Sequence, residues 1–131
     1  MLSERRTRRS EIIIEAIRFQ LMSSLDEGPL NSILVSDDRG MILGAGGPVK
    51  ETDEAMAAVA PLLCRAKRVE RKTLLKTIGV EIPQRVRRDL SVRRFRADGE
   101  SLYLCARGAR GLEKDDAMNH AIIGLKRILG T

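Results

Sequence analysis

The chain has 131 residues, which is enough for one domain and too few for two well-packed ones. Its hydrophobic content of 43% is that of a globular protein, but with 2% aromatic residues the core must be built from Leu, Ile, Val, Met and Ala. The two cysteines lie far apart in the chain, and no apolar run is long enough for a signal peptide or a membrane span. We therefore expect a cytoplasmic protein with reduced thiols.

The first predicted element is a helix over residues 10–26, with Ser10 as its N-cap and Gly28-Pro29 as its end. Within it, apolar residues recur every three or four positions. Residues 1–9 are rich in arginine and are predicted to form a flexible basic N-terminus. The folded domain is accordingly assigned to residues 10–131.

A β-hairpin is predicted next, because the short apolar runs 32–36 and 41–45 flank Asp37-Asp38-Arg39-Gly40. Asp and Gly are the residue types that close such turns. Gly44–Pro48 then ends the sheet segment. Thr52 or Asp53 can cap a second helix, which we expect Pro61 to kink or divide.

The second half of the chain begins with the segment 79–83, which reads either as a linker or as one short strand. Two strands, 90–96 and 100–107, follow around an Asp-Gly turn. A helix over 113–129 completes the chain, with acidic residues near its start and basic residues near its end. The predicted order α-β-β-α-β-β-α indicates an α+β fold, in which helices pack on the faces of an antiparallel sheet.

The hairpin SILVSDDRGMILGAGG (32–47) resembles the opening hairpin of roadblock/LC7 domains, where an apolar strand, an Asp-rich turn ending in Gly and a small-residue strand follow a first helix. The helix from Asp53 and the later strand–Asp-Gly–strand–helix unit match as well, so the resemblance covers nearly the whole chain. It implies a profilin-like or roadblock-like sandwich. It also implies a dimeric adaptor or regulator of small GTPases or motor complexes.

The same hairpin and the helix Glu113–Leu129 are also similar to those of GAF domains, which are small-ligand sensors. That alternative implies a ligand between the sheet and the second helix, covered by the loop Gly44–Pro48 and by the basic segment described below. It requires a cavity at this position.

Catalytic and metal-binding motifs fail their spacing tests. His120 is the only histidine and has no nucleophile or acid at a telling distance in sequence. Cys64 and Cys105 are expected to be buried, inert thiols. The glycine-rich loop lacks the Gly-Lys-Ser/Thr of a phosphate-binding loop, and Val49 stands where the third glycine of a dinucleotide motif belongs. We therefore expect no enzyme activity, no metal and no cofactor.

The strongest functional signal is a basic segment from residue 65 to residue 96, where twelve Lys and Arg residues face three acidic ones. This asymmetry favours an anionic partner, and we expect an acidic protein, with a small GTPase as the example that the resemblance implies. Nucleic acid is the weaker alternative, because only Phe95 interleaves with the arginines. The predicted partner-binding residues are Arg65, Lys67, Arg68, Arg71, Lys72, Arg87, Arg88, Arg93 and Arg94.

The function expected from these features is that of a non-catalytic homodimer acting through protein–protein contacts. A dimer interface is predicted on the second strand and the second helix, where chains pair across a two-fold axis. The residues assigned to it are Met41, Leu43, Met56, Val59 and Leu63.

Overall fold

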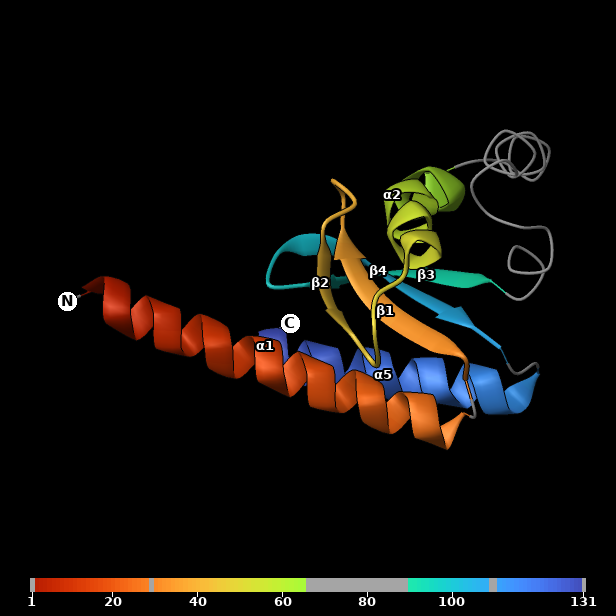
Figure 1. Ribbon diagram of the computed structural model, residues 1–131, viewed down its shortest axis with the longest axis horizontal. Coiled ribbons are helices and arrows are strands. Elements are labelled where there is room, and N and C mark those ends of the chain that lie inside the picture. The colour runs from red at the N-terminus through yellow and green to blue at the C-terminus, as the bar shows by residue number, and fades with distance from the viewer. Residues whose placement is uncertain (1, 29, 66–89, 109–110, 131) are drawn as a thin grey trace.

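A computed structural model describes residues 2–28, 30–65, 90–108 and 111–130, with side chains from residue 11 onward. This part of the chain forms α1 (Leu2–Glu27), β1 (Ser32–Asp37), β2 (Ile42–Ala45), α2 (Glu51–Arg65), β3 (Ser91–Ala97), β4 (Glu100–Arg107) and α5 (Leu112–Leu129) (Figure 1). The order α-β-β-α-β-β-α and the α+β class are as predicted.

The described strands form a four-stranded antiparallel sheet in the order β2-β1-β4-β3. Each predicted hairpin supplies two neighbouring strands, and the hairpins join through β1 and β4, which pair over six positions from Ser32–Arg107 to Asp37–Leu102. This central pairing brings together residues that lie far apart in the sequence.

The two hairpin turns show why the local sequence folds as it does. The Oδ1 atom of Asp37 accepts hydrogen bonds from the backbone N–H groups of Arg39 (2.8 Å) and Met41 (3.0 Å). Gly40 has a φ of 81°, and a Cβ there would lie 2.9 Å from the Cα of Ala58, so the turn packs directly on α2. In the second hairpin, the turn residues Asp98 and Gly99 both have positive φ.

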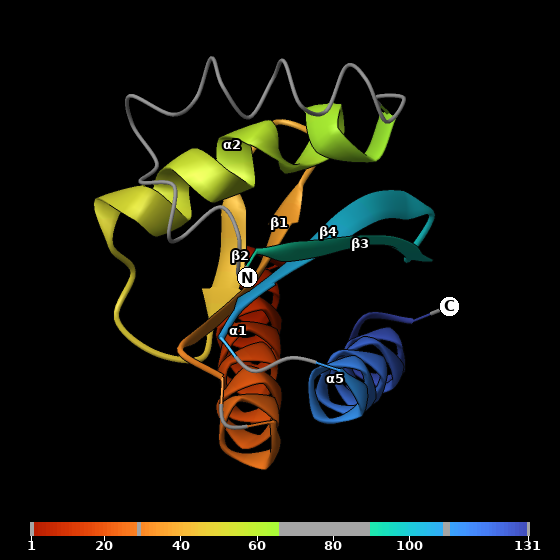
Figure 2. The ribbon, with the colours of Figure 1, turned by 90° about the vertical axis from the view of Figure 1, so that its right-hand side faces the viewer.

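The helices cover the sheet on both faces: α1 and α5 lie side by side on one face and α2 lies on the other (Figure 2). Side chains of β4 alternate between these layers. Leu102 and Leu104 enter the large apolar core under α1 and α5, whereas Tyr103 and Cys105 enter the smaller core under α2. The helices α1 and α5 run antiparallel and so closely that a Cβ on Gly28 would lie 2.6 Å from the Cβ of Ala117.

Three details differ from the sequence expectation or lie beyond it. The first helix begins at Leu2, so Ser10 lies inside α1 and not at its N-cap; residues 2–9 contain no Gly or Pro that would end the helix. The second helix runs through Pro61 to Arg65 and is not divided there. The expected linker or strand at 79–83 lies outside the described residues. Among the described helices, none combines the length and the apolar content needed to cross a bilayer.

Candidate functional site

The predicted basic surface is described only in part. Lys67, Arg68, Arg71, Lys72, Arg87 and Arg88 lie outside the described residues, and the structure places Arg65, Arg93 and Arg94. Arg93 reaches from β3 to α5, where Nη2 donates to Asp115 Oδ1 at 2.8 Å and Nη1 donates to Asn119 Oδ1. Its role is therefore to tie strand to helix. The neighbouring Arg94 is exposed on the opposite face of the sheet.

A polar groove of about 370 Å³ lies at the end of the sheet between the two hairpin turns. Two arginines and three acidic residues line it, so its surface carries charges of both signs. The lining residues are Asp37, Asp38, Arg39, Arg96, Gly99, Glu100 and Ser101.

One wall of this groove is fixed by a buried tyrosine. The hydroxyl of Tyr103 donates to Asp38 Oδ1 at 2.5 Å, and Arg65 Nη2 donates to the same oxygen at 2.9 Å. Burial, together with the adjacent Asp38 carboxylate, raises the pKa of Tyr103 above its ordinary value. These bonds connect β4, the first hairpin and the end of α2. Arg65 nevertheless keeps 57% of its side chain exposed, so it remains available to a partner.

A second polar cluster lies at the start of α2. The carboxylate of Asp53, 5% exposed, accepts from the Lys50 backbone N–H (3.0 Å), the Ser32 hydroxyl (2.9 Å) and Arg107 Nη2 (3.3 Å). The helix already begins at Glu51, so Thr52 and Asp53 lie in its first turn and neither is the predicted N-cap. From its third position, Asp53 makes the reach-back contact of a capping box to the Lys50 N–H. Sequence reasoning missed Arg107, because its partner lies 54 positions away.

Beside this cluster is a cavity of about 200 Å³, bordered by the loop Gly46–Pro48, by Leu25 and by Arg107. The Nε atom of Arg107 is buried, and within the described part of the chain it has no hydrogen-bond partner. The cavity adjoins the glycine-rich loop that the GAF-like alternative assigns as a cover, but Asp53 is the only α2 residue among the described residues that line it, so it lies beside the start of α2 and not between α2 and the sheet. Its volume is below the range of roughly 300–1,000 Å³ that is usual for drug-sized ligands.

The predicted dimer residues are not all on the surface. Met41 is 63% exposed, while Leu43 packs against the core under α1 and α5. On the inner face of α2, Met56 is fully buried, and Val59 and Leu63 are 6% and 7% exposed. The apolar stripe that the sequence offered for dimerisation is thus used by the chain's own core. Contacts with a second chain through α2 would fall on its outer side, which consists of Glu51, Glu54, Ala58, Leu62 and Arg65.

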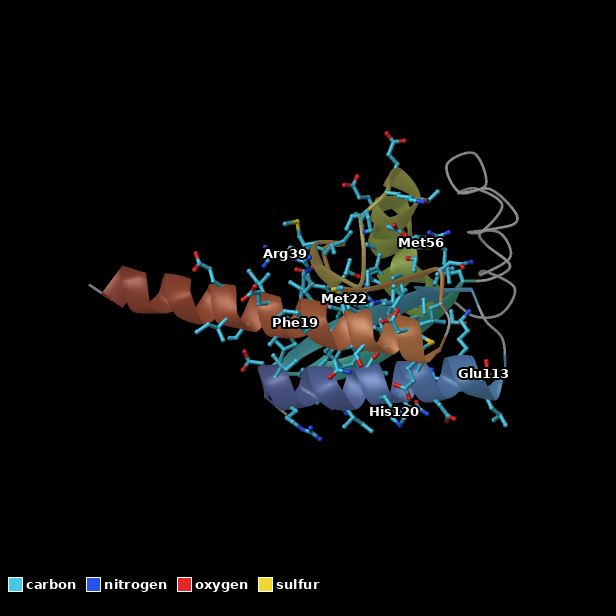
Figure 3. All side chains as sticks on the ribbon, turned by 60° about the horizontal axis from the view of Figure 1, so that its bottom comes forward. Phe19, Met22, Arg39, Met56, Glu113 and His120 are labelled. Carbon is cyan, nitrogen blue, oxygen red and sulfur yellow. The ribbon has the colours of Figure 1, made fainter. Side chains whose placement is uncertain are left out.

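Exposed apolar side chains concentrate instead on α1. Of the ten large apolar residues exposed in the described chain, five belong to this helix: Ile12, Ile13, Ile14, Phe19 and Met22. Figure 3 shows Phe19 and Met22 on α1, beside α5 with His120. Sequence reasoning recognised only the inner face of this helix. The signal for an outer face was present, since Ile12 and Phe19 lie two helical turns apart on the side opposite Leu21.

The remaining reactive side chains have structural contacts. Cys105 is buried as predicted, and burial raises the pKa of its thiol to about 12. Cys64, also predicted to be buried, is only half-buried at the edge of the same core. His120 Nδ1 pairs with Glu27 Oε1 and so links α5 to α1. Within the described residues, no three His, Cys, Asp or Glu side chains gather closely enough to hold a metal ion.

Comparisons with family models, with curated proteins and with solved structures each found no match to this chain. Likeness to roadblock/LC7 or GAF domains stays a prediction from the hairpin sequence and the element order.

Proposed function

We propose that this chain is a non-catalytic, homodimeric adaptor or regulator that acts through protein–protein contacts, the role that the roadblock/LC7 resemblance implies. The observation that carries this proposal is the group of exposed apolar side chains on α1, led by Ile12 at 67% and Phe19 at 65% exposure. A concentration of exposed large apolar side chains on one helix is typical of an interaction site, because leaving them in water is unfavourable.

The placement of the ionisable groups supports a non-catalytic role. Asp53 is committed to a helix cap and to Arg107, and Asp38 to Tyr103 and Arg65. With its raised pKa, the Cys105 thiol is protonated at neutral pH and is a poor nucleophile. A catalytic group needs instead a pKa near the working pH and access to substrate.

The partner that fits best is an acidic protein in the cytoplasm. A small GTPase is the example that the roadblock/LC7 resemblance implies. The basic segment carries an excess of nine positive charges in sequence. In its described part, the side chains of Arg65, Arg94 and Arg96 are exposed. Such charges accelerate association with an acidic surface.

Light scattering coupled to size exclusion tests the dimer. At about 10 μM protein, a concentration that detects micromolar affinity, we expect twice the chain mass of 14.6 kDa. A monomeric mass under these conditions would contradict the proposal. Fluorescence anisotropy then tests the partner class, with a labelled poly-glutamate peptide and a DNA duplex of equal charge. Tighter binding to DNA would indicate that the partner is a nucleic acid and not an acidic protein.

A second candidate, a small-ligand sensor, is favoured by the cavity beside Gly46–Pro48. Lys50 and Arg107 border this cavity, so small oxyanions are suitable first probes. Acetate and phosphate, titrated to about 10 mM to detect millimolar affinity, should then give saturable NMR shifts at the Gly46 and Gly47 amides. Shifts spread over the whole chain, or none, would remove this candidate.

A further inference from the structure

The charges of α1 are divided between its two ends. Residues 2–10 contain four arginines and one glutamate, whereas residues 11–27 contain one arginine and four acidic residues. The net charge is therefore +3 in the first part, −3 in the second and zero in total. This arrangement opposes the helix dipole, which favours acidic residues at the N-terminus and basic residues at the C-terminus. Stability of the isolated helix does not explain it.

The exposed apolar residues lie between these charged ends. At 100° per residue, Ile12, Phe19 and Met22 share the outer side of α1, while Ile17 and Leu21 face the core. Glu15 and Asp26, both exposed, lie on the same outer side. This outer stripe (Ile12, Glu15, Phe19, Met22 and Asp26) carries three apolar residues, with Glu15 between Ile12 and Phe19 and Asp26 at its C-terminal end.

The N-terminal part of α1 also extends beyond its neighbour. Because α1 and α5 are antiparallel, with Glu27 beside His120 and Gln20 beside Gly124, α5 ends at Leu129 near the middle of α1. Figure 1 shows the first turns of α1 projecting away from the sheet and from α5. Ile13 and Ile14 flank the inner face at this point and remain exposed. The N-terminal part of α1 is therefore open to a partner helix beside its inner face as well as along the outer stripe.

We propose that a second copy of this chain covers the outer stripe, through antiparallel pairing of α1 with the partner's α1 across a two-fold axis. This inference depends on the homodimer proposed above and assigns its interface. A register centred on residue 17 places Ile12 level with the partner's Met22, Glu15 level with the partner's Phe19, and helix position 8, an arginine in the sequence, level with the partner's Asp26. Each basic end then meets an acidic part of the other helix, and the two helix dipoles oppose each other.

The charge balance selects this occupant over other candidates. A helix that binds an anionic membrane surface or nucleic acid carries an excess of Lys and Arg, but α1 has a net charge of zero. A helix whose two ends carry opposite charges is complementary to its own antiparallel copy.

Three variants of the full chain test the interface by light scattering and by sedimentation equilibrium. Phe19→Glu should weaken the dimer on the order of a hundredfold, because it removes a large apolar contact and places a carboxylate level with the partner's Glu15. Since Phe19 is 65% exposed, the fold should be retained, as checked by circular dichroism. Arg8→Glu and Asp26→Arg should each weaken their own homodimer about tenfold, because each creates two like-charge contacts.

Mixing the two charge variants gives the sharpest test. In a heterodimer of Arg8→Glu with Asp26→Arg, both contacts are again between opposite charges, so the dimer should recover its wild-type affinity. A mixture no tighter than the separate variants would overturn the proposed register. A matched control, Leu62→Glu on the outer side of α2, replaces a residue that is 50% exposed and should leave the mass unchanged.

These measurements separate the two proposals. Suppose that the wild type and Phe19→Glu are both dimeric and that Leu62→Glu is monomeric. The α1 interface is then wrong, and the homodimer stands with its interface on α2. If the wild type is monomeric, the homodimer itself is wrong, and the α1 interface fails with it.

Discussion

On the face of the sheet covered by α1 and α5, fourteen buried residues form one apolar core, whereas on the α2 face the described chain buries a cluster of six. The smaller cluster includes Ala57 and Ala60, which let α2 approach the sheet but contribute little apolar area. Polar contacts fix both ends of α2 instead: Asp53 with Arg107 at its start, and Arg65 with Asp38 at its end. One layer is thus held mainly by packing, and the other by packing together with polar anchors.

Breaking the anchor at the start of α2 should have the largest effect. Asp53→Ala leaves Arg107, 15% exposed, without its carboxylate and removes the capping contact to Lys50. Because a largely buried charge is costly without its partner, we expect the free energy of unfolding to fall by about 4 kcal/mol in urea denaturation. The matched control Glu54→Ala changes an exposed residue next to it and should stay within about 0.5 kcal/mol. A loss below about 1 kcal/mol for Asp53→Ala would show that α2 is held by packing alone.

Truncation in the large core tests the other layer. Leu104 is fully buried under α1 and α5, and Leu104→Ala should lower the free energy of unfolding by about 3 kcal/mol through lost transfer energy and a residual cavity. Ile123→Ala on the outside of α5, where the residue is 55% exposed, is the control and should be nearly neutral. If both variants lowered the free energy of unfolding equally, Leu104 would not lie in a tightly packed core.

The elements were predictable because their signals are local. Asp37 and Gly40 close the first turn by contacts within five residues, and the alternation along β4 follows from its pleat. The start of α1 was placed too late, because Ser10 is a good N-cap type and nothing in the sequence shows that the helix already begins at Leu2.

The site was less predictable, because it depends on long-range packing. The pairing of β1 with β4 brings Asp53 to Arg107 and Asp38 to Tyr103, and no spacing rule reports either contact. The apolar stripe of α2 is typical of an interface as much as of a core, and in this fold Met56 lies in the core. Most of the basic segment lies outside the described residues, so its role stays a prediction.

An alkaline titration tests the burial of the Cys105 thiol in the core under α2. Burial raises the pKa of Cys105 from 9.0 to about 12, so the folded chain keeps a proton that the unfolded chain loses. The resulting stabilisation is complete below pH 9 and is lost as the pH rises toward 12, at about 1.4 kcal/mol per unit. Relative to wild type, Cys105→Ala should therefore lose less stability between pH 9 and 10 in urea denaturation. An unchanged difference between the two proteins over this interval would contradict the buried thiol.

The smallest effect is expected at the far end of α2. Tyr103→Phe removes the hydroxyl that donates to Asp38, at a cost of about 1 kcal/mol in urea denaturation at pH 7. The cost is modest because the side chain of Asp38 is 50% exposed, so water and Arg65 can satisfy its carboxylate. Arg65→Met provides the second arm of a double-mutant cycle, and coupling through the shared oxygen should make the double variant's loss differ from the sum of the single losses. Additive losses would mean that Tyr103 and Arg65 hold Asp38 independently, so that the end of α2 is attached by a weak surface ion pair while its start is anchored at Asp53.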